Sequence, residues 1–247
     1  MMSADVINVL RNDEMYYGDF GRQFLSNSDI RSLLKDPTQF RKEQPDGKPL
    51  VEGRYFHVSL LEEHKKDDMT IVNASTRNTN IYKDAVAASG KDILLLRSEA
   101  DELDVVVSAM RSNLRFYDLI YAGGNRFEEP AVQEIKGMLW KGKADVVNPS
   151  EGLVIDLKTT QNIDDFHWSA KKNNYDSQAY IYQMLFGYPV LFLVAEKGSG
   201  RLGIFNTSED FLRGGEEKVE RAIEVYHKFY GEDANEDINN FFISQTL

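Results

Sequence analysis

The second half of the chain shows the clearest hydrophobic pattern, because short apolar and β-branched runs there alternate with turn residues. The segment NPSEG (148–152) is typical of a turn between two strands. Three strands, a helix, two more strands and a final helix are therefore expected in this order: 132–138, 143–147, 153–157, 173–186, 189–195, 202–206 and 215–230.

The first half of the chain is predicted to be helical. Residues 26–42 begin with capping Ser and Asn residues, carry an apolar stripe and reach a helix stop at Pro37. Apolar residues at helical spacing follow from Gly53, and a longer helix is expected over 98–113. No repeat or convincing linker divides the chain. We therefore expect one domain over 1–247.

Composition narrows the class of protein. The chain has 247 residues, of which 42% are hydrophobic and 28% charged, as in ordinary globular proteins. It has no cysteine, which excludes disulfides and cysteine-ligated zinc or iron–sulfur clusters and favours a reducing cytoplasmic setting. The first residues are not typical of a signal peptide, and no long apolar run predicts a membrane span.

Charge at first argues against a nucleic-acid partner, because the formal net charge is −11. Its distribution is uneven, however. Residues 134–180 hold six lysines against seven acids, at positions 134, 145, 151, 156, 164, 165 and 176. If three of these acids held metal ions, the surface would become positive and could bind DNA. Charge alone does not decide the question.

The most informative feature is the run LVIDLKT, in which Asp156 and Lys158 stand two apart on a predicted buried strand. Side chains at i and i+2 project from the same face of a strand. Buried charges are costly unless they pair or bind metal. With Glu134 and Asp145 on the preceding strands, the pattern indicates a divalent-metal site for phosphodiester cleavage. Glu134 and Lys136 form an alternative D/E-x-K triplet, and a surface salt bridge is the plain structural explanation of either.

Three further side chains are candidates for the same site. Gln178 and Tyr182 stand four apart on the expected helix after the strand, so they share one face. His57 lies on an earlier, partly apolar helix. For each of the three, simple packing is the commoner explanation when the residue is taken alone. Core packing is also the default expectation for Trp140 and Trp168.

Taken together, these residues resemble the PD-(D/E)xK nuclease superfamily, and more closely the RecE or exonuclease VIII-like double-strand DNA exonucleases. The likeness spans roughly residues 24–230 and is carried by four segments, with Ala144–Asp145 in place of the usual Pro-Asp. The segments are SNSDIRSLLKDPTQF, GRYFHVSLLE, E-x(10)-D-x(10)-DLKTT and QAYIY.

The resemblance implies an α/β (α+β) fold with a central mixed β-sheet flanked by helices, in which a restriction-endonuclease-like core follows an N-terminal helical segment. That segment would cover about 1–50, the core about 51–231 and a tail 232–247.

The resemblance also assigns roles within the site. It implies that His57, Glu134, Asp145, Asp156 and the carbonyl of Leu157 hold Mg²⁺, with Mn²⁺ also accepted. No iron–sulfur cluster is expected. Lys158 would position the attacking water, and Gln178 and Tyr182 would orient water and phosphate. Glu134, Asp145, Asp156, Lys158, Gln178 and Tyr182 are thus the expected catalytic residues, while Lys143, Thr159 and Thr160 are expected to contact DNA.

The implied activity is metal-dependent degradation of linear double-stranded DNA, 5′ to 3′, which leaves 3′ single strands for recombination. The expected partners are double-stranded DNA ends, a single-strand annealing protein and further copies of this chain in a ring, with no membrane. The setting would be a bacterial or phage-infected cytoplasm. An endonuclease or helicase-associated nuclease on the same core, and an inactive DNA-end-binding module, remain alternatives.

Overall fold

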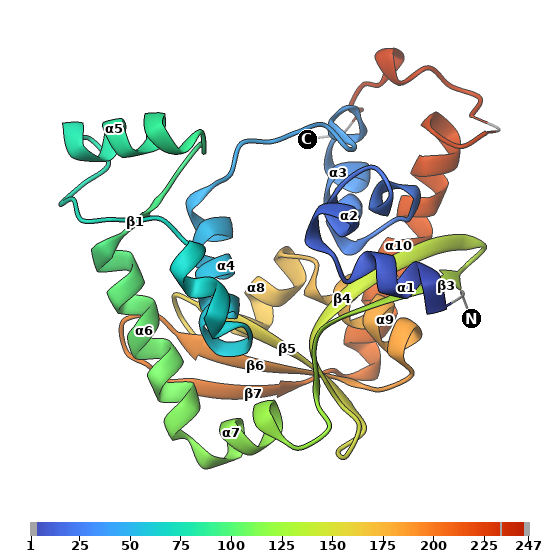
Figure 1. The fold of residues 1–247 in the computed structure, drawn as a ribbon. Helices are drawn as coiled ribbons and strands as arrows, with labels where there is room; N and C mark the ends of the chain where they lie inside the picture. The colour runs from blue at the N-terminus through green and yellow to red at the C-terminus, as the bar shows by residue number, and fades with distance from the viewer. Residues whose placement is uncertain (1–3, 233, 245–247) are drawn as a thin grey trace.

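The structure, a computed structural model, describes residues 4–232 and 234–244 and has a five-stranded sheet at its centre (Figure 1). Residues 1–3, 233 and 245–247, which belong to the expected N-terminal segment and tail, lie outside the described residues. The helices are α1 Ala4–Leu10, α2 Asp13–Tyr17, α3 Asn27–Lys35, α4 Lys48–Leu61, α5 Asn80–Ser89, α6 Arg97–Ser112, α7 Leu114–Tyr121, α8 Phe166–Lys172, α9 Tyr175–Phe186 and α10 Glu209–Phe229. The strands are β1 Ile71–Val72, β2 Leu95–Leu96, β3 Arg126–Ile135, β4 Met138–Asn148, β5 Leu153–Thr160, β6 Val190–Glu196 and β7 Leu202–Asn206.

The central sheet is mixed and has the order β3-β4-β5-β6-β7. Strands β3, β4 and β5 form an antiparallel meander, and β7 returns antiparallel to β6. Strands β5 and β6 are parallel, so the chain must cross over between them, which it does through α8 and α9. The two-residue strands β1 and β2 form a separate small parallel sheet beside α5.

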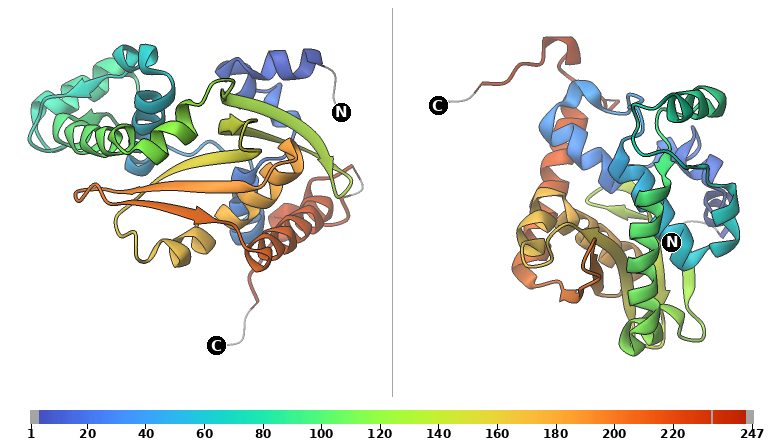
Figure 2. Two further views of the ribbon diagram at one scale, coloured as in Figure 1. Left: turned by 90° about the horizontal axis from the view of Figure 1, so that it is seen from below. Right: turned by 90° about the vertical axis from the view of Figure 1, so that its left-hand side faces the viewer.

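Helices cover both faces of the central sheet (Figure 2). Apolar residues of α4, α6 and α7 form one core with alternate residues of β5 and β6, such as Leu157 and Leu193. The opposite core joins α3, α8, α9 and α10 to the intervening residues, such as Val154 and Phe192. Because both faces are buried, β6 is apolar nearly throughout and β5 is apolar from Leu153 to Leu157 except for its acid, which therefore stands out.

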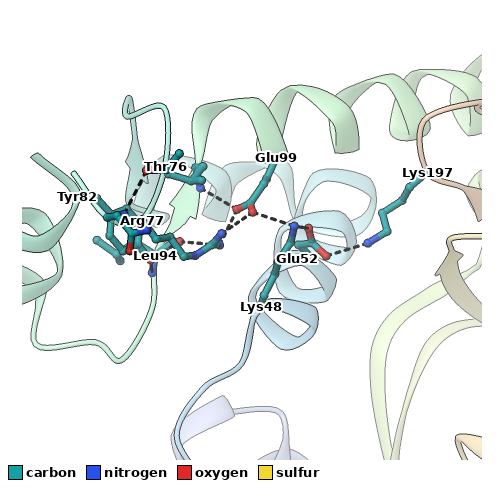
Figure 3. Close-up of polar contacts among 10 residues, drawn as sticks. Lys48, Glu52, Thr76, Arg77, Tyr82, Leu94, Glu99 and Lys197 are labelled. Atoms are coloured by element: carbon teal, nitrogen blue, oxygen red, sulfur yellow. Dashed lines mark hydrogen bonds and ion pairs between the residues drawn. The ribbon is translucent and has the colours of Figure 1, made fainter.

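Buried ion pairs fix helix α4, which carries His57, against the rest of the fold (Figure 3). The carboxylate of Glu52 on α4 lies 2.9 Å from the Lys197 ammonium and 3.4 Å from that of Lys48. Lys48 in turn lies 3.0 Å from Glu99 on α6. A buried carboxylate is tolerated when cations surround it in this way. The cluster therefore holds α4 between the β6–β7 turn and α6.

The sheet flanked by helices confirms the fold class expected from the sequence, and the five strands follow the expected order. The strand expected at 132–138 is wrong, because β3 ends at Ile135 and β4 begins at Met138. Lys136 and Gly137 form the two-residue hairpin loop, with φ of 53° and 79°. Two consecutive positive φ values are the signature of the tight turn that suits strand twist.

Helices α5, α7 and α8 were not foreseen at all. None of the helices in the described ranges contains a stretch both long and apolar enough to cross a membrane.

Candidate active site

The candidate site lies where β4 and β5 separate. Strand β4 pairs with β3 along almost its whole length, but it pairs with β5 only over 146–148. Beyond that point a pocket of about 350 Å³ opens between the strands and α9. Gly142 lets α9 approach β4 closely, since a Cβ there would lie 2.6 Å from Leu185 and 2.8 Å from Tyr182. The pocket is thus bounded by the sheet below and α9 at its side.

Three acids form a row across three neighbouring strands. Glu128 on β3 lies opposite Asp145 on β4, because the pairs on either side of them, 127 with 146 and 129 with 144, are in register. Continuing the register of Val146 with Ile155 brings Asp145 next to Asp156 on β5. Like charges directly opposite each other destabilise a sheet unless a cation lies between them.

Glu128 is the acid with the least support from the protein. Its backbone has a φ of 46°, a left-handed conformation that non-glycine residues adopt at a cost of roughly 1 kcal/mol, often at functional sites. Within the described residues its carboxylate makes no hydrogen bond or ion pair. Burial, reinforced by the charge of Asp145, raises the pKa of Glu128 to about 8. A cation at this place would restore its ordinary charge.

His57 of α4 reaches the same row. Its Nε2 lies 3.0 Å from the carbonyl oxygen of Leu157, which can only accept a hydrogen bond, so this nitrogen carries a proton. Its Nδ1 then faces Asp145 Oδ1 at 3.3 Å. With the proton on Nε2, the lone pair of Nδ1 faces the carboxylate, and a metal ion between them would bind both. The other oxygen of Asp145 accepts a hydrogen bond of 2.6 Å from the Leu157 N–H.

Asp156 and Lys158 form a buried ion pair on β5. Asp156 is 1% exposed, and its Oδ1 accepts a hydrogen bond of 2.7 Å from Gln178 of α9. Its Oδ2 pairs with the Lys158 ammonium, which also lies 4.8 Å from the centre of the Tyr175 ring. Burial raises the pKa of Asp156 to about 6, although the charge of Lys158 opposes the rise. Burial alone would lower the pKa of Lys158, but the charges of Asp156 and Asp145 outweigh it and raise it.

The far wall of the pocket is basic. Lys141 and Lys143 of β4 both point their ammonium groups at Tyr16 of α2, with Nζ 4.2 and 4.5 Å from the ring centre. Lys143 also pairs with the carboxylate of Asp13. Burial lowers the pKa of Lys141 to about 8. Tyr182 donates a hydrogen bond of 2.8 Å to the Lys143 carbonyl and is otherwise buried.

Comparison with known proteins identifies the family to which this chain belongs. The family model of a PDDEXK-like domain of unknown function (DUF3799) matches residues 29–235, which is most of the chain. This protein belongs to that PD-(D/E)xK-like family. No curated protein matches the chain.

Two solved structures are similar to this chain, and the first of them shows its fold. A candidate exonuclease from Eubacterium rectale has a TM-score of 0.64 at 16% identity, with 96% of this chain and 95% of that one covered. A phage-related exonuclease from Haemophilus somnus has a TM-score of 0.38 at 14% identity, with 83% of this chain and 94% of that one covered.

The structure brings most of the expected residues of this PD-(D/E)xK-like chain together. Seven of them line the pocket: His57, Lys143, Asp145, Asp156, Lys158, Gln178 and Tyr182. The Leu157 backbone lies behind them, hydrogen-bonded to both His57 and Asp145. Thr159 and Thr160 follow on β5 but do not line the pocket, and the Thr160 hydroxyl donates to the carbonyl of Asn162.

Glu134 was expected in the metal site, but the structure places it outside the pocket. Glu134 is exposed and lies opposite Leu139 beside the hairpin loop, away from the pocket. Glu128 takes the place expected for it. The sequence contains the information needed to find Glu128. With the hairpin turn at Lys136–Gly137, counting back equally along both strands places position 128 opposite Asp145. Of the two tryptophans, Trp140 is buried as expected, but Trp168 is 69% exposed.

The donor set fits a divalent metal ion. One oxygen each of Glu128 and Asp145 and a nitrogen of His57 lie within 4.8 Å of one another. Mg²⁺ prefers carboxylate oxygens, and Mn²⁺ also accepts an imidazole nitrogen. The unpartnered Glu128 and the unsatisfied contact of His57 with Asp145 are what such an ion would relieve.

Proposed function

We propose that this protein is a metal-dependent deoxyribonuclease that degrades linear double-stranded DNA from its ends. One observation carries the proposal: three carboxylates, one from each of three neighbouring strands, converge on a pocket beside a buried lysine. The site would hold Mg²⁺ or Mn²⁺ between Glu128, Asp145 and His57, with Asp156 and the Leu157 carbonyl at its edge. Such an ion lowers the pKa of a bound water and offsets the charge of the scissile phosphate.

The protein's own groups divide the remaining work. Lys158 stays protonated beside Asp156 and can donate hydrogen bonds to the attacking water and to a phosphate oxygen that gains negative charge. Gln178 fixes the carboxylate of Asp156 through its amide. Tyr182 holds the backbone of β4 by its bond to the Lys143 carbonyl, and so acts by positioning rather than by contact with DNA. Lys141 and Lys143 supply positive charge for the DNA backbone.

The finer parts of the proposal rest on resemblance. The neighbour from Eubacterium rectale is described as a candidate exonuclease, which supports action at DNA ends rather than within the duplex. We propose 5′-to-3′ polarity, a ring of several copies through which the duplex threads, and a cytoplasmic role in recombination with a single-strand annealing protein. Sedimentation of the purified protein tests the ring, because a monomer would contradict it.

The test of function uses linear blunt duplex DNA labelled at one 5′ end or one 3′ end, beside a closed circle. Each is incubated with Mg²⁺, Mn²⁺ or EDTA, with wild-type protein and the Asp156→Ala variant. Early mononucleotide release from the 5′ label, sparing the circle and absent in EDTA and in the variant, is expected. Early release from the 3′ label would reverse the polarity, and cutting of the circle would make the enzyme an endonuclease. DNA binding with no metal-dependent product would leave a binding module.

A further inference from the structure

The rim of the pocket carries an aromatic side chain that the roles assigned above leave unused. Tyr17, the last residue of α2, lines the pocket although its side chain is 66% exposed. Tyr16 and Tyr182 also line the pocket but are buried. Among the described residues, the other exposed large aromatics, Tyr117, Phe127, Trp168 and Phe242, lie elsewhere. An exposed ring beside the acidic row is therefore specific to Tyr17.

The backbone that carries Tyr17 is firmly held. Tyr16 packs in a small core with Leu10, Phe24 and Val132, which anchors α2 to β3. The side chain of Asn12 caps the helix by accepting a hydrogen bond of 3.1 Å from the Met15 N–H. A rigid base for an exposed ring lowers the entropy that is lost when a ligand binds.

The ring itself is also oriented before any ligand arrives. The Tyr16 and Tyr17 rings meet edge to face, with their centres 4.9 Å apart. The Lys143 ammonium lies 5.4 Å from the centre of the Tyr17 ring, within the range of a cation–π contact. The same lysine belongs to the basic wall, so a phosphate near that wall would bring its nucleobase close to Tyr17.

We infer that the Tyr17 ring is a stacking platform for the nucleobase next to the phosphate at the acidic row. The inference rests on the proposed function, since it takes DNA as the ligand. Aromatic rings stack on all four bases, so the platform would serve an enzyme that degrades DNA of any sequence. On a duplex end, a base held by Tyr17 must have left its complement. Stacking on the ring would offset part of the cost of that separation.

The test combines a change in the protein with a change in the DNA. The DNA is a blunt duplex with a fluorescent label at the far end, either intact or with one abasic nucleotide at the first, second or third position of the attacked end. The proteins are wild type, Tyr17→Ala, Tyr17→Phe and, as a matched control, Tyr117→Ala on the remote surface of α7. The dissociation constant is measured by anisotropy in EDTA, and the single-turnover rate with Mn²⁺.

The stacking role predicts a specific pattern. Tyr17→Ala should weaken binding of intact DNA about 5- to 100-fold, the range found for loss of one base–aromatic stack. Tyr17→Phe and Tyr117→Ala should bind like wild type. At one abasic position, wild type and Tyr17→Ala should bind equally, because the partner of the ring is already gone.

Two results would overturn the inference. The first is that Tyr17→Ala loses affinity by the same factor on intact and on every abasic DNA, because the ring would then act without a base. Tyr17→Phe could fall as far as Tyr17→Ala, which would assign the effect to the hydroxyl. The wild-type protein could also bind DNA without cleaving it in the presence of any metal. That result would contradict the proposed nuclease function but not the stacking role of Tyr17, because the binding measurements in EDTA test that role separately.

Discussion

Replacing Glu128 by Gln should make the metal-free protein more stable while removing its stabilisation by metal. The carboxylate is half-buried opposite Asp145 and makes no hydrogen bond or ion pair with the described residues. Burial and the charge of Asp145 raise its pKa to about 8, although the charge of Lys143 opposes the rise. The folded protein therefore resists ionising this group, whereas the unfolded chain ionises it freely. The amide of Gln has nearly the same shape and carries no charge, so it removes this cost.

The magnitude follows from the pKa. Below pH 4.5, the ordinary pKa of a Glu side chain, Glu128 is protonated in both states and its burial does not reduce the free energy of unfolding. As the pH rises from 4.5 toward 8, the unfolded chain ionises this group but the folded protein does not, so the free energy of unfolding falls. Above pH 8 the loss levels off. Each pH unit in that interval is worth about 1.4 kcal/mol, or roughly 3 kcal/mol between 4.5 and pH 7. Water entry and local relaxation reduce such costs, so we expect a gain of about 1–2 kcal/mol. For a chain of this size that raises the melting temperature by roughly 2–8 °C.

The assay is urea unfolding followed by tryptophan fluorescence, in EDTA, from pH 4 to pH 8.5. Glu134→Gln is the matched control, because Glu134 is exposed beside the hairpin loop and should leave stability unchanged at every pH. In a second series Mn²⁺ replaces EDTA. A ligand at a hundred times its dissociation constant stabilises the folded state by about 2.7 kcal/mol, and Glu128→Gln should lose most of this gain.

The reasoning fails if Glu128→Gln is no more stable than wild type at pH 8 in EDTA, or if any gain is the same at pH 4. Loss of metal stabilisation in Glu134→Gln, with none in Glu128→Gln, would return the third acid to the position first expected from the sequence.

Three other predictions concern single contacts. Lys158→Ala should slow single-turnover cleavage roughly 10²–10³-fold, and a near-normal rate would remove Lys158 from the mechanism. Gly142→Ala places a Cβ 2.8 Å from Tyr182 and should lower the free energy of unfolding in urea by about 1–3 kcal/mol. As a control, Gly53→Ala has open space around it and should stabilise α4 by about 0.5–1 kcal/mol. Equal effects of the two substitutions would contradict the close approach of α9 to β4. Lys197→Met removes one of the two cations beside the buried carboxylate of Glu52 and should lower the free energy of unfolding by roughly 1–3 kcal/mol. An unchanged urea midpoint would show that Lys48 alone is enough to stabilise this carboxylate.

The sequence was sufficient where a single element carries the information. Asp156 and Lys158 share one face of β5, and a buried strand with two charges on one face has few structural explanations. Gln178 and Tyr182 likewise share one face of α9, and both turn to the pocket. The short helices α5, α7 and α8 were missed because each has ten residues or fewer, so that the apolar period repeats too few times to be recognised.

Errors arose where two elements must be placed against each other. Glu134 was chosen because 132–138 has the composition of one strand, although the chain turns back at Lys136–Gly137. The surroundings of Lys143 could not be foreseen either, because its ammonium is buried against Tyr16 and paired with Asp13. Both partners come from α2, a five-residue helix far from Lys143 in the sequence, which no local pattern connects with β4.

Asp156, Asp145 and Glu128 differ in how far neighbouring protein groups stabilise their negative charge. The acid with the least support from the protein should depend most on a bound metal ion. Asp156 has Lys158 and Gln178, and Asp145 accepts a hydrogen bond from the Leu157 N–H, so the fold itself supports part of both charges. Glu128 has neither, and it also has a left-handed backbone. The charge of Lys143 compensates part of the cost, and a cation shared with Asp145 would compensate more. The acid that local sequence pattern identifies least well is therefore the one whose charge reports metal binding most directly.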